Sequence, residues 1–154
     1  MPFLLSDKPV KTNRELAHRE PAAPPLRILV AEDNDVSRLL VVRLLEKHGH
    51  TVLEARTGLE ALVVLEKGDV DVILMDIQMP DLDGLQATAE IREREAGTGR
   101  HVPIIALTAH AIKGDRERCL ESGMDDYLSK PIQPADLMAA LGRACASRQP
   151  LAEV

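Results

Sequence analysis

Residues 71–82 read DVILMDIQMPDL, an apolar run with strand character that stops at a carboxylate. Val72–Met75 is apolar, Asp76 follows it, and the next residues include a proline typical of a turn. In a parallel α/β sheet, the ligand crevice lies outside the carboxyl ends of the strands. We therefore expect Asp76 to face a functional crevice rather than the core.

Three other apolar runs end in polar side chains in the same way: 28–31 at Glu32–Asp33, 104–107 at Thr108, and 127–129 at Lys130–Pro131. Taken alone, each polar residue is explained by a turn, a helix cap or a solvated lysine. Chance is a poor explanation for finding all of them at the ends of successive strands. Three acids, a hydroxyl and an ammonium together indicate chemistry on a phosphoryl group and a metal ion.

From Leu26 onward the chain alternates between strand-like and helix-like segments. The expected strands cover 27–31, 51–55, 71–75, 103–107 and 126–128. The expected helices cover 35–48, a segment beginning at 57, 84–95, 112–121 and 134–146. These βα repeats predict a doubly wound parallel α/β sheet, in either the flavodoxin-like (βα)5 order 2-1-3-4-5 or a half Rossmann unit. No G-x-G-x-x-G or P-loop sequence follows the first strand, which removes the main support for dinucleotide or nucleotide binding.

Some helices carry more specific expectations. Thr57 and Glu60 form a capping-box sequence, in which each side chain accepts a hydrogen bond from the other residue's amide. Asp81 and Asp83 are expected to be turn and cap residues of the helix from 84. The face of the first helix that we expect to be buried consists of Val36, Leu39, Leu40 and Leu44. The same helix also carries Val41, Val42 and Leu45, more apolar residues than one buried face requires.

The first 25 residues differ from the rest because they are rich in proline and charge and show little periodicity. We expect residues 1–25 to be a linker or flexible tail, 26–146 to form one domain, and 147–154 to be a C-terminal tail.

The composition argues against several classes of function. The net charge is −6 with no basic block, which disfavours direct binding to nucleic acid. No apolar stretch approaches the roughly 20 residues that span a bilayer, and no signal peptide is evident, so we expect a cytoplasmic protein. Cys119 and Cys145 lack metal-ligand spacing and are expected to be free thiols, and the histidines also lack such spacing. Phe3 and Tyr127 are the only aromatic residues, so the core must be aliphatic.

In the order 2-1-3-4-5, Glu32, Asp33, Asp76, Thr108 and Lys130 surround one crevice. Crowded carboxylates raise one another's pKa unless a cation compensates, and Mg²⁺ favours carboxylates together with water and phosphate oxygens. One acid is then free to act as a nucleophile, and the central Asp76 is the candidate for an aspartyl phosphate. Lys130 and Thr108 would bind the phosphoryl oxygens.

The motifs ILVAEDN, DVILMDIQMPDLDG, PIIALTA and YLSKPI, in this order and spacing, resemble those of bacterial response-regulator receiver domains over about residues 26–146. The resemblance implies the flavodoxin-like fold, with Asp76 as the phospho-acceptor. The Mg²⁺ ligands that it implies are Glu32, Asp33, Asp76 and the backbone carbonyl of Gln78, with Asp33 a direct ligand. It further implies a conformational switch formed by Thr108 and Tyr127, a phosphate-binding Lys130 and a cis bond before Pro131.

The longer stretch ALTAHAIKGDRERCLESGMDDYLSKPI, residues 106–132, further resembles receivers of hybrid sensor histidine kinases and phosphorelays. The partner implied is a phosphohistidine donor, either a histidine kinase or a histidine phosphotransfer domain. The residues expected to dock it are Val36, Ser37, Leu40, Pro131 and Ile132. His110, two residues after Thr108, is a candidate for the mouth of the site.

We therefore expect a receiver that takes a phosphoryl group onto Asp76 in a Mg²⁺-dependent reaction and then changes conformation. Its only chemistry would be self-directed phosphotransfer and autodephosphorylation, so we do not expect an enzyme in the ordinary sense. A phosphatase of the haloacid-dehalogenase type stays open, but that class carries D-x-D after its first strand, whereas Ile77 and Gln78 follow Asp76 in the third. A pseudo-receiver that only binds also stays open and is disfavoured by the intact acids and lysine.

Overall fold

The computed structural model describes residues 25–109 and 113–153. Nearly all of the expected N-terminal linker, together with His110 and Ile112, therefore lies outside the described residues. Within the described part, no helix is both long enough and apolar enough to cross a membrane.

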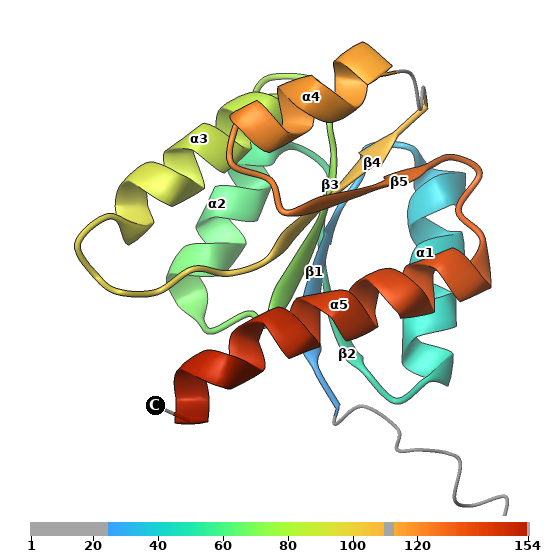
Figure 1. Cartoon of the computed structure of the whole chain (residues 1–154). Helices are drawn as coiled ribbons and strands as arrows, with labels where there is room; N and C mark the ends of the chain where they lie inside the picture. Colours follow the sequence, from blue (N-terminus) through green and yellow to red (C-terminus); the bar gives the residue numbers. More distant parts are fainter. Residues whose placement is uncertain (1–24, 110–112, 154) are drawn as a thin grey trace, which may run out of the picture.

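Five parallel strands form a single sheet in the order β2-β1-β3-β4-β5, which confirms the flavodoxin-like order and not the Rossmann half (Figure 1). The strands are β1 (Arg27–Ala31), β2 (Thr51–Ala55), β3 (Val72–Asp76), β4 (Ile104–Thr108) and β5 (Asp126–Ser129). The helices are α1 (Asp35–Lys47), α2 (Gly58–Lys67), α3 (Gly84–Glu95), α4 (Lys113–Glu121) and α5 (Pro134–Glu153). Helices α1 and α5 cover one face of the sheet, and α2, α3 and α4 cover the other.

The central strands are apolar along their whole length because both of their faces are covered. In β3, Ile73 and Met75 pack into the cluster under α2, α3 and α4, whereas Val72 and Leu74 pack under α1 and α5. This division follows from the alternation of side chains along a strand. The core is aliphatic as predicted, with Tyr127 only partly buried at its margin.

The ends of several elements differ from those expected. Strands β3, β4 and β5 each extend one residue further, so that Asp76 and Thr108 are the last residues of their strands rather than the first of the following turns. Helix α5 runs to Glu153, beyond the expected end at Ala146, so residues 147–153 are helical.

The buried face of α1 is not the one expected. Its buried apolar residues are Val41, Val42 and Leu45. Val36 and Leu40 are instead 68% and 64% exposed, and Leu39 is 49% exposed. Helix α1 carries two apolar stripes that both fit a helical period, and periodicity alone cannot tell which one meets the sheet.

The helix caps agree with the sequence in part. Thr57 caps α2 by accepting a hydrogen bond from the amide of Glu60, but the Glu60 carboxylate accepts from the amide of Arg56, so the reciprocal half of the expected box is wrong. Asp83 is the cap of α3 as expected, and it forms a complete capping box with Gln86.

Glycine at position 84 allows α3 to start directly against the end of β3. A Cβ atom there would collide with the backbone carbonyl of Asp76. Asp81, in the turn before α3, has a φ of 68°, a left-handed conformation that Asp and Asn tolerate better than most residues. The turn that carries the chain away from Asp76 is therefore fixed by local sequence.

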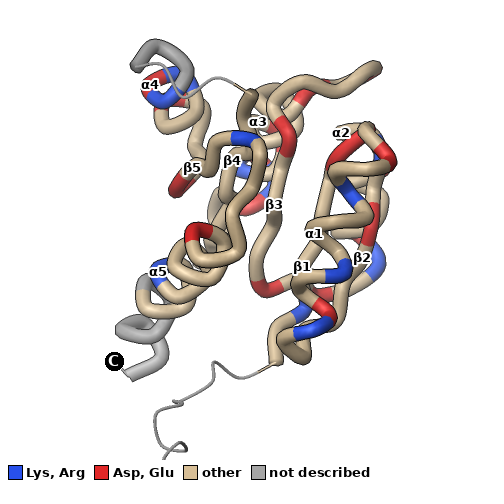
Figure 2. Tube along the Cα trace, turned by 90° about the vertical axis from the view of Figure 1, so that its right-hand side faces the viewer, with Lys and Arg blue, Asp and Glu red and all other residues tan. Residues whose placement is uncertain are grey.

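Charged residues of both signs are distributed along the chain. In the view of Figure 2, lysines and arginines are interspersed with aspartates and glutamates along the chain. Neither Cys119 nor Cys145 forms a disulfide bond, as predicted.

Candidate functional site

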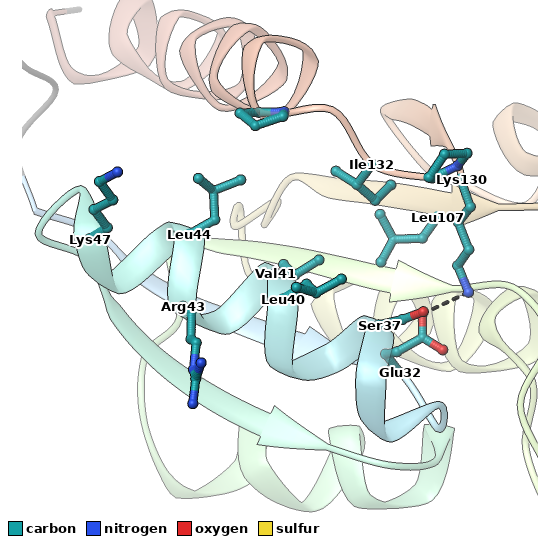
Figure 3. Close-up of a pocket in the computed structure, with 12 residues that line it drawn as sticks. Glu32, Ser37, Leu40, Val41, Arg43, Leu44, Lys47, Leu107, Lys130 and Ile132 are labelled. Atoms are coloured by element: carbon teal, nitrogen blue, oxygen red, sulfur yellow. Dashed lines mark ion pairs between the residues drawn. The ribbon is translucent and has the colours of Figure 1, made fainter.

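The carboxyl ends of β1, β3, β4 and β5 bring together the polar residues predicted from the sequence. Glu32, Asp76 and Thr108 are only 1%, 4% and 1% exposed, whereas the side chain of Asp33 is exposed. The register pairs Asp76 with Leu107 and Thr108 with Ser129, which sets the three strand ends side by side. Lys130 follows β5, and its ammonium points toward Glu32 (Figure 3).

Lys130 forms ion pairs with two buried acids. Its Nζ lies 2.7 Å from Oε1 of Glu32 and 3.2 Å from Oδ2 of Asp76. Burial alone would lower the pKa of Lys130, but the hydrogen bond with Glu32 and the charges of both acids raise it above its ordinary value. The lysine therefore stays charged, and it joins the strand ends electrostatically.

The pKa of Asp76 is raised well above its ordinary value. Burial is the main cause that raises its pKa to about 7, and the neighbouring Glu32 side chain adds to the rise. The amide of Gln78, which donates to Oδ1 at 3.1 Å, and the charge of Lys130 act in the opposite direction. One lysine does not fully compensate two buried carboxylates, so the site favours additional positive charge.

The acids are grouped as a hard cation requires. Glu32, Asp33 and Asp76 each offer an oxygen, and these oxygens all lie within 4.8 Å of one another. Mg²⁺ prefers carboxylate oxygens with water completing its shell, and the exposed Asp33 leaves such a shell open to solvent. These residues therefore fit Mg²⁺.

Glu32 is held by hydrogen bonds on three of its groups. Its Oε2 accepts from the amide of Asn34 at 3.1 Å, and its own amide donates to the carbonyl of Ala55 at 3.0 Å. Its carbonyl accepts from Nη1 of Arg38 at 2.9 Å. Arg38 was not predicted from the sequence, because nothing in the pattern of α1 shows that an arginine turns back toward the preceding loop.

The two residues expected to form a switch lie on neighbouring strands. The carbonyl of Thr108 accepts from the amide of Lys130 at 2.7 Å, which ties the end of β4 to the lysine loop. Tyr127 pairs in register with Ala106 and is half-buried, and the guanidinium of Arg116 lies 5.7 Å from its ring centroid. The Lys130–Pro131 peptide bond is cis, as the resemblance implied.

Four of the five residues expected to dock a partner, Ser37, Leu40, Pro131 and Ile132, line a groove between α1 and the segment after β5. The groove has a volume of about 420 Å³ and runs beside Glu32 and Lys130 (Figure 3). Its apolar lining comes from Leu40, Val41, Leu44, Leu107, Pro131, Ile132 and Pro134. Ser37 and Lys47 also border the groove, and Val36 lies exposed on α1.

The sequence model of the response regulator receiver domain family matches residues 28–142. The chain belongs to this family, and it is a receiver domain of the kind used in two-component and phosphorelay signalling. The match favours the receiver over the phosphatase considered from the sequence.

Relatives of two kinds are similar to this chain. Hybrid signal transduction histidine kinase I of Dictyostelium discoideum is 52% identical over 115 residues, which are 71% of this chain and 7% of that protein. The polar-differentiation response regulator DivK of Brucella ovis is 42% identical over 105 residues, 68% of this chain and 84% of DivK. The chain spans only 6% to 14% of the length of the hybrid and sensor kinases that it matches.

Solved structures agree with these relatives. The receiver domain of a sensor histidine kinase from Pseudomonas aeruginosa PAO1, which has a magnesium ion in its active site cleft, is 45% identical with a TM-score of 0.70. The match covers 78% of this chain and 97% of that one. The receiver domain of Ssk1 from Saccharomyces cerevisiae, in complex with the histidine phosphotransfer protein Ypd1, is 33% identical with a TM-score of 0.69. That match covers 75% of this chain and 85% of the Ssk1 chain.

The perturbed pKa of Asp76 predicts how the stability of the metal-free protein depends on pH. Between its ordinary pKa of 3.8 and the raised value of about 7, folded Asp76 holds a proton that the unfolded chain has lost. Stability therefore falls as the pH rises through this window. We expect Asp76→Asn to be more stable than the wild type at about pH 8, by on the order of 1 kcal/mol, and to lose this advantage toward about pH 4. Urea unfolding in the presence of a chelator measures the difference, and a gap that does not change with pH would contradict the assignment.

Proposed function

We propose that this receiver accepts a phosphoryl group from a phosphohistidine partner onto Asp76, in a Mg²⁺-dependent reaction. The observation that carries the proposal is a buried carboxylate at the central strand end, with an ammonium 3.2 Å from one of its oxygens. Burying an acid is costly. A role in binding a cation and reacting with a phosphoryl group would explain why Asp76 is buried beside two other acids.

In the proposed transfer, an oxygen of Asp76 attacks the phosphorus. The new O–P bond forms as the N–P bond of phosphohistidine breaks, and the bonding electrons return to the imidazole nitrogen. The amide of Gln78 holds Oδ1 at 3.1 Å, and Lys130 holds Oδ2. These contacts orient the carboxylate, and in the proposed transfer Lys130 and Thr108 would bind phosphoryl oxygens.

The cation would be held by Glu32, Asp33 and Asp76, with the carbonyl of Gln78 as the fourth protein group. The charge that Mg²⁺ supplies when bound offsets that of the carboxylates and of the incoming phosphoryl group. The geometry that supports this assignment is the convergence of the three acids, and the magnesium ion in the receiver from Pseudomonas aeruginosa supports it by similarity.

The partner would dock over the groove between α1 and the segment after β5. A donor histidine must reach covalent distance of Asp76, and the groove is the apolar surface that borders Glu32 and Lys130. Exposed Val36 and Leu40 extend it along α1. An apolar patch of this kind suits a helical partner, and the Ssk1 receiver bound to Ypd1 shows that a related domain associates with a histidine phosphotransfer protein.

The same proposal includes a conformational response. A phosphoryl group on Asp76 offers new acceptors to the Thr108 hydroxyl, and movement of β4 would release Tyr127 from its position beneath Arg116. The module would act on itself alone, without turnover of other substrates. We place it in the cytoplasm, because its two cysteines form no disulfide bond, which suits a reducing compartment.

Asp76→Ala is expected to abolish labelling by acetyl phosphate and Mg²⁺, because it removes the nucleophile. Asp81→Asn, which changes an exposed acid in the same turn, should label like the wild type. Intact-mass spectrometry measures the adduct. Equal labelling of Asp76→Ala would overturn the assignment. Multiple turnover of phosphomonoesters by the wild type would indicate a phosphatase, and no labelling of the wild type would indicate a receiver that only binds.

Val36→Lys and Ile132→Glu are each expected to slow transfer from a phosphohistidine protein that phosphorylates the wild type, by tenfold or more. Labelling by acetyl phosphate should be nearly unchanged, because neither residue is a proposed ligand of the cation or of the phosphoryl group. Val63→Lys, a matched change at an exposed apolar residue of α2, should leave both reactions intact. Equal loss of both reactions would point to damage of the site, and no loss of either would show that the partner docks elsewhere.

Beryllofluoride binding, which imitates the phosphoryl group, is expected to change the environment of the Tyr127 ring and of the Thr108 methyl group. NMR spectra of the free and bound protein measure both. Asp76→Ala should show no such change. Identical Tyr127 signals in the two states of the wild type would count against the switch.

A further inference from the structure

Arg38 is a buried arginine on α1 that the proposed transfer does not use. Arg38 is only 7% exposed, and it lies on the buried side of α1 with Val41, Val42 and Leu45. A guanidinium is rarely buried unless every part of it is paired, because its desolvation is costly. The contacts of Arg38 therefore indicate what its burial achieves.

Three nitrogens of Arg38 point to three different groups. Nη2 donates to Oδ1 of Asp35 at 2.6 Å, and Nε donates to Oε1 of Glu54 at 3.0 Å. These partners have exposed side chains, 71% and 53% accessible, so water screens both ion pairs. Nη1 donates at 2.9 Å to the carbonyl of Glu32, and this third hydrogen bond is buried.

The carbonyl of Glu32 lies just beyond the end of the β1–β2 ladder. The paired register ends at Ala31 and Ala55, and the amide of Glu32 still donates to the carbonyl of Ala55. The next backbone acceptor, the Glu32 carbonyl, takes its hydrogen bond from Arg38 instead of from a strand. A buried carbonyl without a partner would be costly, so Arg38 fixes the peptide that joins Glu32 to Asp33.

We propose that Arg38 is a positioning residue for the acidic pair, and that it holds the Glu32–Asp33 peptide so that both carboxylates face the cation site. The effect on cation binding rests on the proposed function. The clamp, which is the hydrogen bond from Arg38 to the Glu32 carbonyl, does not depend on a metal. Arg38 also joins the start of α1 to β2 through Glu54, so a purely structural role as a helix–strand link is the competing explanation. The two roles differ in which contact matters.

The test compares Arg38→Met with two controls in the full chain. Arg38→Met keeps an unbranched apolar stem of similar length to that of arginine but lacks the guanidinium, and so removes every side-chain donor. Glu54→Gln weakens the link to β2 and leaves the bond to the Glu32 carbonyl in place. Arg43→Met makes the same chemical change at an exposed arginine of α1 that forms no ion pair with any described residue.

Two measurements decide the role of Arg38. The first is amide hydrogen exchange in the metal-free protein at Glu32, bonded to Ala55, and at Asn34, bonded to the Glu32 carboxylate. We expect exchange there to rise tenfold or more in Arg38→Met and to stay near the wild-type rate in both controls. The second is Mg²⁺ affinity, which should fall about tenfold in Arg38→Met alone, while saturating Mg²⁺ restores most of the acetyl-phosphate labelling.

Each other result overturns the assignment. Unchanged exchange at Glu32 and Asn34 would show that Arg38 does not hold the loop, and an equal rise in Glu54→Gln would show a helix–strand link. If Arg38→Met shows faster amide exchange but binds Mg²⁺ as tightly as the wild type, Arg38 does not position the acids for the cation. Should Arg38→Met fail to fold, Arg38→Lys replaces it, since an ammonium cannot reproduce three separated donors. Absence of Mg²⁺ binding by the wild type would count against the proposed function, and the exchange data would still decide the clamp.

Discussion

The ammonium of Lys130 lies between two buried carboxylates, 2.7 Å from Glu32 and 3.2 Å from Asp76. Leaving either acid without a partner in the interior would cost several kcal/mol. One lysine cannot neutralise two acids, and the pKa of Asp76 rises to about 7, chiefly through burial and the nearby Glu32. The negative charge that makes this cluster costly on its own is the property that suits it to a divalent cation.

The sheet makes this cluster possible because its parallel strands end at one edge. Both faces of β3 are covered, and all of its residues are buried. Along β3 and β4 the polar side chains are therefore confined to the last position, Asp76 and Thr108, and the parallel order brings those ends to one edge. The absence of a Cβ at Gly84 lets α3 begin against the backbone of Asp76, so the chain turns away directly after β3. Fold and site thus depend on the same few strand ends.

Sequence patterns were informative where a feature is local and were weak where it depends on packing. Abrupt changes from apolar to polar residues located Glu32, Asp76, Thr108 and Lys130, because strand ends in a parallel sheet share an edge. The exposed face of α1 could not be predicted, since two apolar stripes on that helix have the same period. The reciprocal half of the Thr57 cap failed because the Glu60 carboxylate reaches the amide of Arg56 instead. Arg38 was missed because its partners, the Glu32 carbonyl and Glu54, come from the loop after β1 and from β2, both outside the pattern of α1.

The two faces of α1 give this helix two separate tasks. Its inner face packs Val41 and Leu45 against the sheet, and from the same side Arg38 reaches the carbonyl of Glu32. Its outer face leaves Val36 and Leu40 exposed, beside the groove that borders Lys130. A partner that packs on the outer face would contact the same helix whose Arg38 binds the carbonyl of Glu32. Docking and the geometry of the cation site would then be coupled through the rigid body of one helix, with no need for a longer path through the core.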